Sequence, residues 1–449
     1  MLSLAIDERH LNRSIVNVAW PIAIAHLSLA LLTAIDGVLV GQFVGKDALA
    51  GVGLGALVLW LPQAGSLGLS TGATTVTSWD IGANAASRLG RTINASVALG
   101  ALWGVLVSAM VAGGAGPIMT IMGLEGQAHT DGANYLRAAG FSLLGFSVFE
   151  AASGVLRGAG HTRTPMVIII GFNLLNAALT FVLISGYFGL ELGTAGAGIG
   201  STIGALAGAT VALAVLARGS VGVPWRLREA TSVPVQSARR VLGLSVPVAL
   251  EEAQFMLAFL AYARIITSVS TEATAAHAAA LRTLDLIIMP AFAMGLACTA
   301  LVGQALGARR VDLAERLANR TRNISLAVMI SLATVGFFVA PHVPRVFTDD
   351  PEVLREAGNV LRIFVLAVPA LSLSTSMSGA LRGAGDVRFV LLIMTVTAWG
   401  VRVPAAFVGA RVFEWGLVGA WLGAVLEVNV RGILTWLRFR SGQWKHRTV

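Results

Sequence analysis

Long apolar segments follow one another along the whole chain, separated by short polar stretches. Each is at least about as long as the roughly 20 residues that a helix needs to cross a bilayer. Lipid favours helices over strands, because it offers no water to unpaired backbone groups. The pattern therefore predicts an all-α integral membrane protein with twelve transmembrane helices. The predicted spans lie near residues 15–41, 51–80, 92–116, 134–156, 165–187, 194–216, 241–268, 273–302, 320–341, 358–381, 389–412 and 417–437.

The composition excludes a soluble protein. Only 12% of the 449 residues are charged and 56% are hydrophobic, whereas soluble domains have about 25% charged residues. The net charge of +9 is explained by loop residues that set membrane orientation, so nucleic acid is not expected as a partner. The single cysteine, Cys298, excludes an internal disulfide and a cysteine-based metal cluster.

The distribution of basic residues predicts the orientation of the chain. With the N-terminus in the cytoplasm, 23 of the 32 Lys and Arg residues fall on the cytoplasmic side, 6 fall outside and 3 lie within spans. Cytoplasmic loops collect Lys and Arg, so we expect both termini to be cytoplasmic. The sequence thus predicts a multi-pass protein of the inner, or plasma, membrane.

A basic, glycine-rich phrase occurs twice. LRGAGHTRTP begins at Leu156, and LRGAGDVRFV begins at Leu381, 225 residues later. Pro21 falls on Pro247 with one residue of slip. This register predicts a duplication of six plus six helices, and an even number gives both halves the same orientation. Such a parallel repeat is typical of transporters. We expect residues 1–217 to form one lobe, 218–240 a cytoplasmic linker and 241–449 the other lobe.

Polar groups gather at one depth in the first half. Asp36 is predicted to lie about 12 Å below the outer end of the first span, counted at 1.5 Å per residue. Asn176 and Thr180 on the fifth span, and Ser201 and Thr202 on the sixth, come to a similar depth. No Lys or Arg shares the middle of these spans. The group can bind a proton or a small cation; a structural hydrogen-bond cluster is the alternative.

The neutral neighbours of Asp36 favour a proton over sodium. A sodium ion would give up most of its water for one carboxylate and a few neutral oxygens, whereas a proton needs only the carboxylate. We therefore expect the coupling ion to be a proton, with sodium at Asp36 as the alternative. No organic cofactor and no other metal is expected.

The second half is richer in ionisable residues within its spans. A charge in the membrane interior costs at least about 2.5 kcal/mol, so each such residue needs a partner or a function. Structural pairs are one interpretation, since Arg282 with Asp285 and Glu427 with Arg431 are spaced to pair on a helix. A substrate cavity is the other. Its candidates are His26, Glu251, Glu252, Gln254, Met256, Arg282, Asp285 and Arg402.

Several phrases resemble the multidrug and toxic compound extrusion (MATE) family. They are IDGVLVGQFVGKDALAGV, LRGAGHTRTPM, NLLNAALTFVL, AAHAAALR, VGQALGARR and LRGAGDVR, and they occur in the family's order over almost the whole chain. The resemblance implies two six-helix lobes in a V around a central cavity that opens alternately to each side. It also implies export of organic cations in exchange for protons or sodium ions.

The resemblance also implies roles for individual residues. Asp36 matches the aspartate to which the family assigns ion or proton binding, and Asn176 matches an asparagine of the same site. The position of Thr180 is commonly aspartate in the family, and the tenth span carries hydroxyls where the sodium-type pattern has an acid. Both departures put a sodium site of the usual kind in doubt.

These observations predict a secondary active multidrug exporter of amphipathic, cationic organic compounds, acting as a monomer among membrane lipids. The alternative is a flippase for lipids or lipid-linked precursors, which would need several basic residues in its cavity. Arg264, Arg282 and Arg402 are the candidates for that role. An enzyme is not expected, because the sequence has no HExxH, nucleophile elbow or phosphate-binding loop.

The orientation can be tested by labelling. In a chain that lacks Cys298, a cysteine placed in the segment 44–49 should react with an impermeant thiol reagent in intact cells. A cysteine placed in the linker 218–240 should react only after the cells are opened. The reverse labelling would contradict the predicted orientation.

Overall fold

The computed structural model describes residues 6–187, 189, 191–222, 234–340 and 350–446. Within these ranges every regular element is a helix. The described chain forms two compact units: unit 1 comprises residues 24–249, and unit 2 comprises residues 6–23 and 250–446. The predicted linker lies partly outside the described residues, because 223–233 are not among them.

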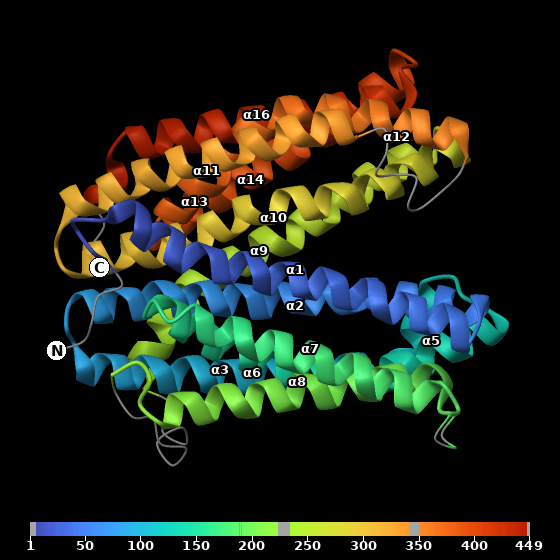
Figure 1. The fold of residues 1–449 in the computed structure, drawn as a ribbon, viewed down its shortest axis with the longest axis horizontal. Helices are drawn as coiled ribbons and strands as arrows, with labels where there is room; N and C mark the ends of the chain where they lie inside the picture. Colours follow the sequence, from blue (N-terminus) through green and yellow to red (C-terminus); the bar gives the residue numbers. More distant parts are fainter. Residues whose placement is uncertain (1–5, 188, 190, 223–233, 341–349, 447–449) are drawn as a thin grey trace. The chain divides into compact units, whose positions relative to one another are not determined.

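Unit 1 is a bundle of helices that run lengthwise beside one another, as α2, α3, α6, α7 and α8 do in Figure 1. Small residues at the contacts bring these helices close together, which suits packing in lipid. Its elements are most of α1 (Leu11–Phe43), then α2 (Lys46–Gly82), α3 (Ala86–Gly113), α4 (Ala115–Ile121), α5 (Gly126–Ala139), α6 (Ser142–Gly158), α7 (Arg163–Ile184) and α8 (Gly193–Ala217).

Unit 2 has the same helix order with more breaks. Besides the first part of α1, it contains the later part of α9 (Val235–Thr267). It continues through α10 (Thr271–Gly307), α11 (Val311–Val339), α12 (Pro351–Phe364), the 3-10 turn η3 (Val365–Ala367) and α13 (Val368–Gly383). It ends with α14 (Val387–Thr397), the π-helical turns η4 (Ala398–Arg402) and η5 (Val408–Val412) on either side of α15 (Val403–Phe407), α16 (Gly416–Arg440) and η6 (Gln443–His446).

The predicted all-α membrane architecture is confirmed. Eleven helices of the described chain are long and apolar enough to cross a membrane, and α5 with α6 brings the number to as many as twelve. That pair, bent by 43°, covers the span predicted at 134–156. The predicted span at 358–381 is likewise interrupted, because η3 separates α12 from α13. The apolar pattern thus located both spans, but it predicted neither the bend between α5 and α6 nor the 3-10 turn between α12 and α13.

The duplication is visible in the backbone. Both α2 and α10 have 37 residues, and each end of α10 lies 225 positions after the matching end of α2. In unit 1 the Thr74 hydroxyl donates to the Gly154 carbonyl at 3.0 Å. In unit 2 the Thr299 hydroxyl donates to the Gly379 carbonyl at 3.0 Å, and both residues are again 225 positions later. The two units therefore repeat the same interhelical hydrogen bond.

The glycine of the repeated LRGAG phrase explains why the phrase recurs. A Cβ atom on Gly158 would lie 2.5 Å from the Thr74 carbonyl oxygen, and one on Gly383 would lie 2.6 Å from the Thr299 carbonyl oxygen. Only glycine allows the backbones of α6 and α2, or of α13 and α10, to approach so closely. The phrase is a packing element as well as a turn.

Two long helices contribute to both units. Residues of α1 before Ile24 belong to unit 2 and those after belong to unit 1, whereas α9 changes from unit 1 to unit 2 after Ala249. Pro21 lies two residues before Ala23, at the change in α1, and Pro247 lies two residues before Ala249. A proline within a helix removes one backbone hydrogen bond. The compact units therefore differ from the halves of the sequence by the first parts of these two helices.

The glycine contacts give a stability prediction. We expect Gly383→Ala to lower the free energy of unfolding by about 1–3 kcal/mol, the usual range for an overpacked contact. The matched control is Gly171→Ala in α7, where a Cβ atom would meet nothing within 4 Å. Thermal unfolding of the purified protein in detergent measures both. Equal melting temperatures for Gly383→Ala and the wild type would contradict the assigned packing.

Candidate functional site

Three predicted residues form one hydrogen-bonded chain in unit 1. The Asn176 side-chain amide donates to Asp36 Oδ2 at 3.3 Å, and the Thr180 hydroxyl donates to Asn176 Oδ1 at 3.1 Å. Asn176 and Thr180 are buried, and Asp36 is partly buried. Within the described residues Asp36 Oδ1 is buried without a hydrogen-bond partner, and no Lys or Arg forms an ion pair with this carboxylate. One carboxylate thus has only neutral partners.

Glycines on α8 make room for this chain. Asn176 and Thr180 lie four residues apart and so share one face of α7. Gly200 and Gly204 of α8 pack against that face, and a Cβ atom on Gly200 would lie 2.7 Å from Thr180 Oγ1. A Cβ atom on Gly204 would lie 3.2 Å from Asn176 Cβ. The glycines of α8 therefore leave room for the side chains of Asn176 and Thr180, and Asn176 reaches Asp36 of α1.

Ser201 and Thr202 do not join the Asp36 group. The Ser201 hydroxyl donates to the carbonyl of Ala197 at 3.1 Å, and the Thr202 hydroxyl donates to the carbonyl of Ala138 at 2.7 Å. The predicted depth of Ser201 and Thr202 in the membrane did not determine the direction in which their hydroxyls point. Both hydroxyls complete backbone hydrogen bonds on α8 and α5.

A second polar contact joins α1 and α7, the helices that carry Asp36 and Asn176. The Asn173 side-chain amide donates to the Ser28 hydroxyl at 3.2 Å, and Asn173 Oδ1 is buried without a partner. Asn173 precedes Asn176 by three residues, so both amides face α1 from neighbouring turns. Sequence reasoning did not select Asn173 or Ser28, although the asparagine spacing was a signal for them.

Glu150 and Glu251, two other carboxylates within the bundles, have basic partners. In unit 1 Glu150 pairs with Arg157 at 2.8 Å, and His26 lies within electrostatic range of both. In unit 2 Glu251 pairs with Arg382 at 2.7 Å. Arg157 and Arg382 are the arginines of the two LRGAG phrases, so each copy supplies a buried ion pair. Removing one member of such a pair is strongly destabilising, because the other charge stays buried.

A charge network surrounds Arg402 in unit 2. Arg402 pairs with Glu427 at 2.8 Å, and Arg431 contacts the other oxygen of the same carboxylate at 3.2 Å. The Arg402 guanidinium also lies over the rings of Phe255 and Tyr262, at 5.3 and 5.8 Å from their centroids. The sequence spacing predicted the contact between Glu427 and Arg431, which the structure shows. It did not predict that Arg402 also pairs with Glu427. This guanidinium is therefore not a free cation for a lipid phosphate.

The remaining candidates for a substrate cavity do not form one cluster. Glu252 and Met256 are half-buried, and the Gln254 side chain donates to the Leu391 carbonyl at 3.4 Å. Arg282 is exposed. The side chain of Asp285 lies outside the described residues, so the predicted Arg282–Asp285 pair does too.

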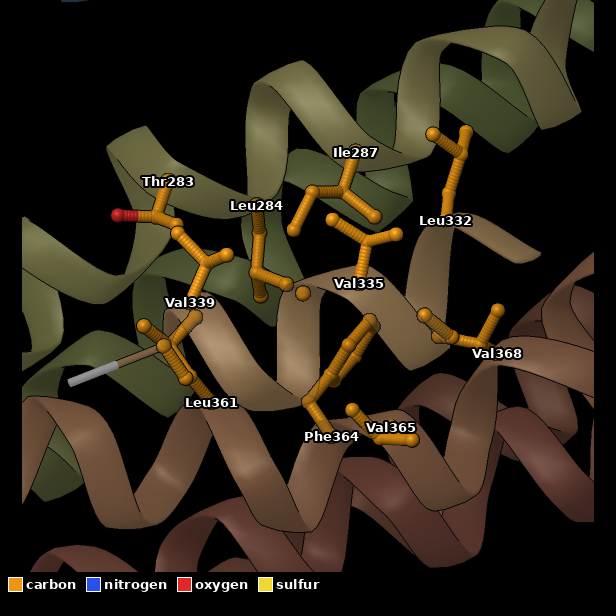
Figure 2. Close-up of a pocket in the computed structure, with 13 residues that line it drawn as sticks. Thr283, Leu284, Ile287, Leu332, Val335, Val339, Leu361, Phe364, Val365 and Val368 are labelled. Atoms are coloured by element: carbon orange, nitrogen blue, oxygen red, sulfur yellow. The ribbon is translucent and has the colours of Figure 1, made fainter. Parts of the chain in front are cut away.

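An apolar pocket lies elsewhere in unit 2, between α10, α11, α12 and α13 (Figure 2). Its volume is about 200 Å³, and Thr283 is the one hydroxyl-bearing residue among those that line it. Leu284, Phe364 and Val368 face into it from three of the elements. None of the predicted cavity residues contributes to this pocket. In the described part of the chain no group of three His, Cys, Asp or Glu side chains could hold a metal ion.

These features define a class of protein. Two helical units with one repeated set of interhelical contacts, long apolar spans and a buried carboxylate with neutral partners define a multi-pass membrane transporter with an internal parallel repeat. The MatE family model matches the chain twice, at residues 21–182 and 247–408. The two matches are 226 positions apart and begin at Pro21 and Pro247.

Individual relatives agree with the family match. The probable multidrug resistance protein NorM of Thermotoga maritima is 30% identical over 98% of this chain and 94% of its own length. The uncharacterized transporter YisQ of Bacillus subtilis is 24% identical over 96% of this chain and 94% of its own. The chain therefore belongs to the MatE family of multi-pass transporters. A solved MOP superfamily transporter from Pyrococcus furiosus shares the fold, with a TM-score of 0.90, 22% identity and 97% of each chain covered.

Proposed function

We propose that this transporter is a multidrug exporter that exchanges protons for amphipathic organic cations, with Asp36 as the proton-binding group. The observation that carries the proposal is the partner set of Asp36 in the described chain: one amide, one linked hydroxyl and no basic residue. A carboxylate without a counter-ion is expensive to bury in a membrane protein, and a proton removes that charge.

The geometry supports a proton more than a sodium ion. Asp36 Oδ1 has no described partner and can take a proton, while Oδ2 keeps its hydrogen bond from Asn176. Asn176 Oδ1 already accepts from Thr180, which leaves few oxygens to replace the water shell of sodium. Thr180 also stands where the resembling family commonly has a second carboxylate.

Exchange follows from linkage between the two binding events. If substrate binds more tightly when Asp36 is ionised, proton binding weakens substrate binding by the same factor. A proton that enters from outside then favours release of the substrate there. The printed names of the relatives, probable multidrug resistance proteins, support drug-like substrates. A cationic substrate suits the ionised carboxylate.

The proposed setting is the plasma membrane with both termini in the cytoplasm. The bias of Lys and Arg toward that side supports this orientation. The exporter needs no ATP in this scheme, because the proton gradient supplies the free energy.

Asp36→Asn tests the proposal directly. The amide keeps the size of the side chain but cannot take up a proton, so we expect loss of substrate export driven by an imposed proton gradient. Proteoliposomes that carry a fluorescent organic cation such as ethidium measure this. We expect export of the wild type under a proton gradient in sodium-free buffer.

The matched control is Glu191→Gln, which makes the same chemical change at an exposed position of unit 1. It should export at the wild-type rate. Thermal unfolding should show that Asp36→Asn remains folded. Normal export by Asp36→Asn, or wild-type export that follows a sodium gradient and ignores the proton gradient, would contradict the proposal.

A further inference from the structure

A histidine in unit 2 is buried without a hydrogen-bond partner. His277 lies on α10 and is 6% exposed, and neither ring nitrogen has a partner in the described chain. Aromatic rings surround it: the centroids of Tyr262 and Trp421 each lie 5.7 Å from its own, and that of Phe259 lies 6.2 Å away. We call Tyr262, His277 and Trp421 the ring cluster.

The other two members of the ring cluster are also unsatisfied. The Tyr262 hydroxyl and the Trp421 indole nitrogen are buried and have no described hydrogen-bond partner. Most buried polar side-chain atoms in proteins have a hydrogen-bond partner, and each exception calls for an explanation. The rings of Tyr262 and Trp421 each contact His277, so the three exceptions are adjacent. Their rings come from α9, α10 and α16, so the cluster joins three helices.

The charges around the ring cluster leave His277 without an acidic partner. On the side of Tyr262 lies Arg402, whose guanidinium is 5.8 Å from the centroid of the Tyr262 ring and is paired with Glu427 of α16. On α10 itself Glu272 is exposed in the first helical turn. Glu356 of α12 has a buried oxygen, and its charged neighbours are Glu352, Arg355 and Glu272. No described carboxylate contacts the imidazole.

This arrangement fits a neutral imidazole and not a charged one. An imidazolium here would be a buried cation with a guanidinium nearby and no acceptor for either N–H. Histidine is also the side chain that most readily changes charge near neutral pH. Protonation of His277 therefore disfavours the packed form of the ring cluster.

We propose that His277 is a second proton-binding group of this transporter, in unit 2, and that proton uptake there opens the ring cluster. The proton adds to the lone pair of the unprotonated ring nitrogen, and no other bond changes. After rearrangement the Tyr262 oxygen can accept a hydrogen bond from the imidazolium, and the aromatic faces can stabilise the cation. The role in transport rests on the proposed proton coupling at Asp36, from which His277 is separate in sequence and in unit.

Linkage gives the proposal a measurable slope. If the open form of the cluster binds one proton that the closed form does not, the open population rises up to about tenfold per pH unit as the pH falls. Backbone amides of α10 around His277 should then exchange with deuterium more readily at low pH than their chemical rates require.

The experiment is hydrogen–deuterium exchange with mass spectrometry on the purified, full-length protein between pH 3 and 8. Exchange at the imidazole C2 position reports the protonation of each histidine. Exchange of the amides in 271–284 reports opening. We expect His277 to titrate in this range, and the amides to open with it in the wild type and in the control His10→Gln, an exposed histidine outside the spans. Opening should lose its pH dependence in His277→Gln.

A second variant separates protonation from packing. His277→Phe keeps a ring in the cluster and cannot bind a proton, so it should remain folded and stay closed at every pH. The proposal is overturned if His277 does not titrate between pH 3 and 8, or if His277→Gln and His277→Phe open with the wild-type pH dependence.

The two proposals fail separately. The exchange measurement uses no substrate and no gradient, so it decides the His277 switch even if Asp36→Asn exports normally. In Asp36→Asn the response of His277 should persist. Loss of that response in Asp36→Asn would mean that both effects have one titrating group, which contradicts a second site.

Discussion

The cost of placing a charge inside a membrane protein governs the polar interior of this chain. Glu150, Glu251 and Glu427 each meet that cost through an arginine at 2.8 Å or less. Asp36 does so only through an amide, and its second oxygen has no described partner. No arginine of the described chain balances the charge of this carboxylate, and a proton can remove it. The lack of a described basic partner thus distinguishes the proposed site for a coupling ion from the structural ion pairs.

Glycine decides where these polar groups can meet. The glycines of α8 let α7 approach closely around Asn176 and Thr180, and Asn176 donates a hydrogen bond to Asp36 on α1. The repeated contacts of Gly158 with Thr74 and of Gly383 with Thr299 hold the same helix pair together in each unit. Both copies of the duplicated scaffold carry a buried ion pair, but unit 1 adds a carboxylate with no described basic partner and unit 2 adds the ring cluster.

Much of this could be predicted from the sequence. Apolar length located the spans and the 225-residue register located the repeat, because both can be read from the order of residues along the chain. Asp36, Asn176 and Thr180 were placed together correctly by depth, whereas Ser201 and Thr202 proved to bond to backbone carbonyls. Depth does not specify rotation about a helix axis. The partners of Arg382 and Arg402 are on other helices, 131 and 25 residues away, so only the folded chain shows them.

Proton release on substrate binding tests the central claim most directly. In weakly buffered detergent solution near neutral pH, addition of an organic cation that binds should displace a proton from the wild-type protein, and a pH indicator would record it. The account predicts that this release disappears when Asp36 is replaced by asparagine, in the presence or absence of sodium. Binding with no proton release, or release that survives loss of the Asp36 carboxylate, would contradict it.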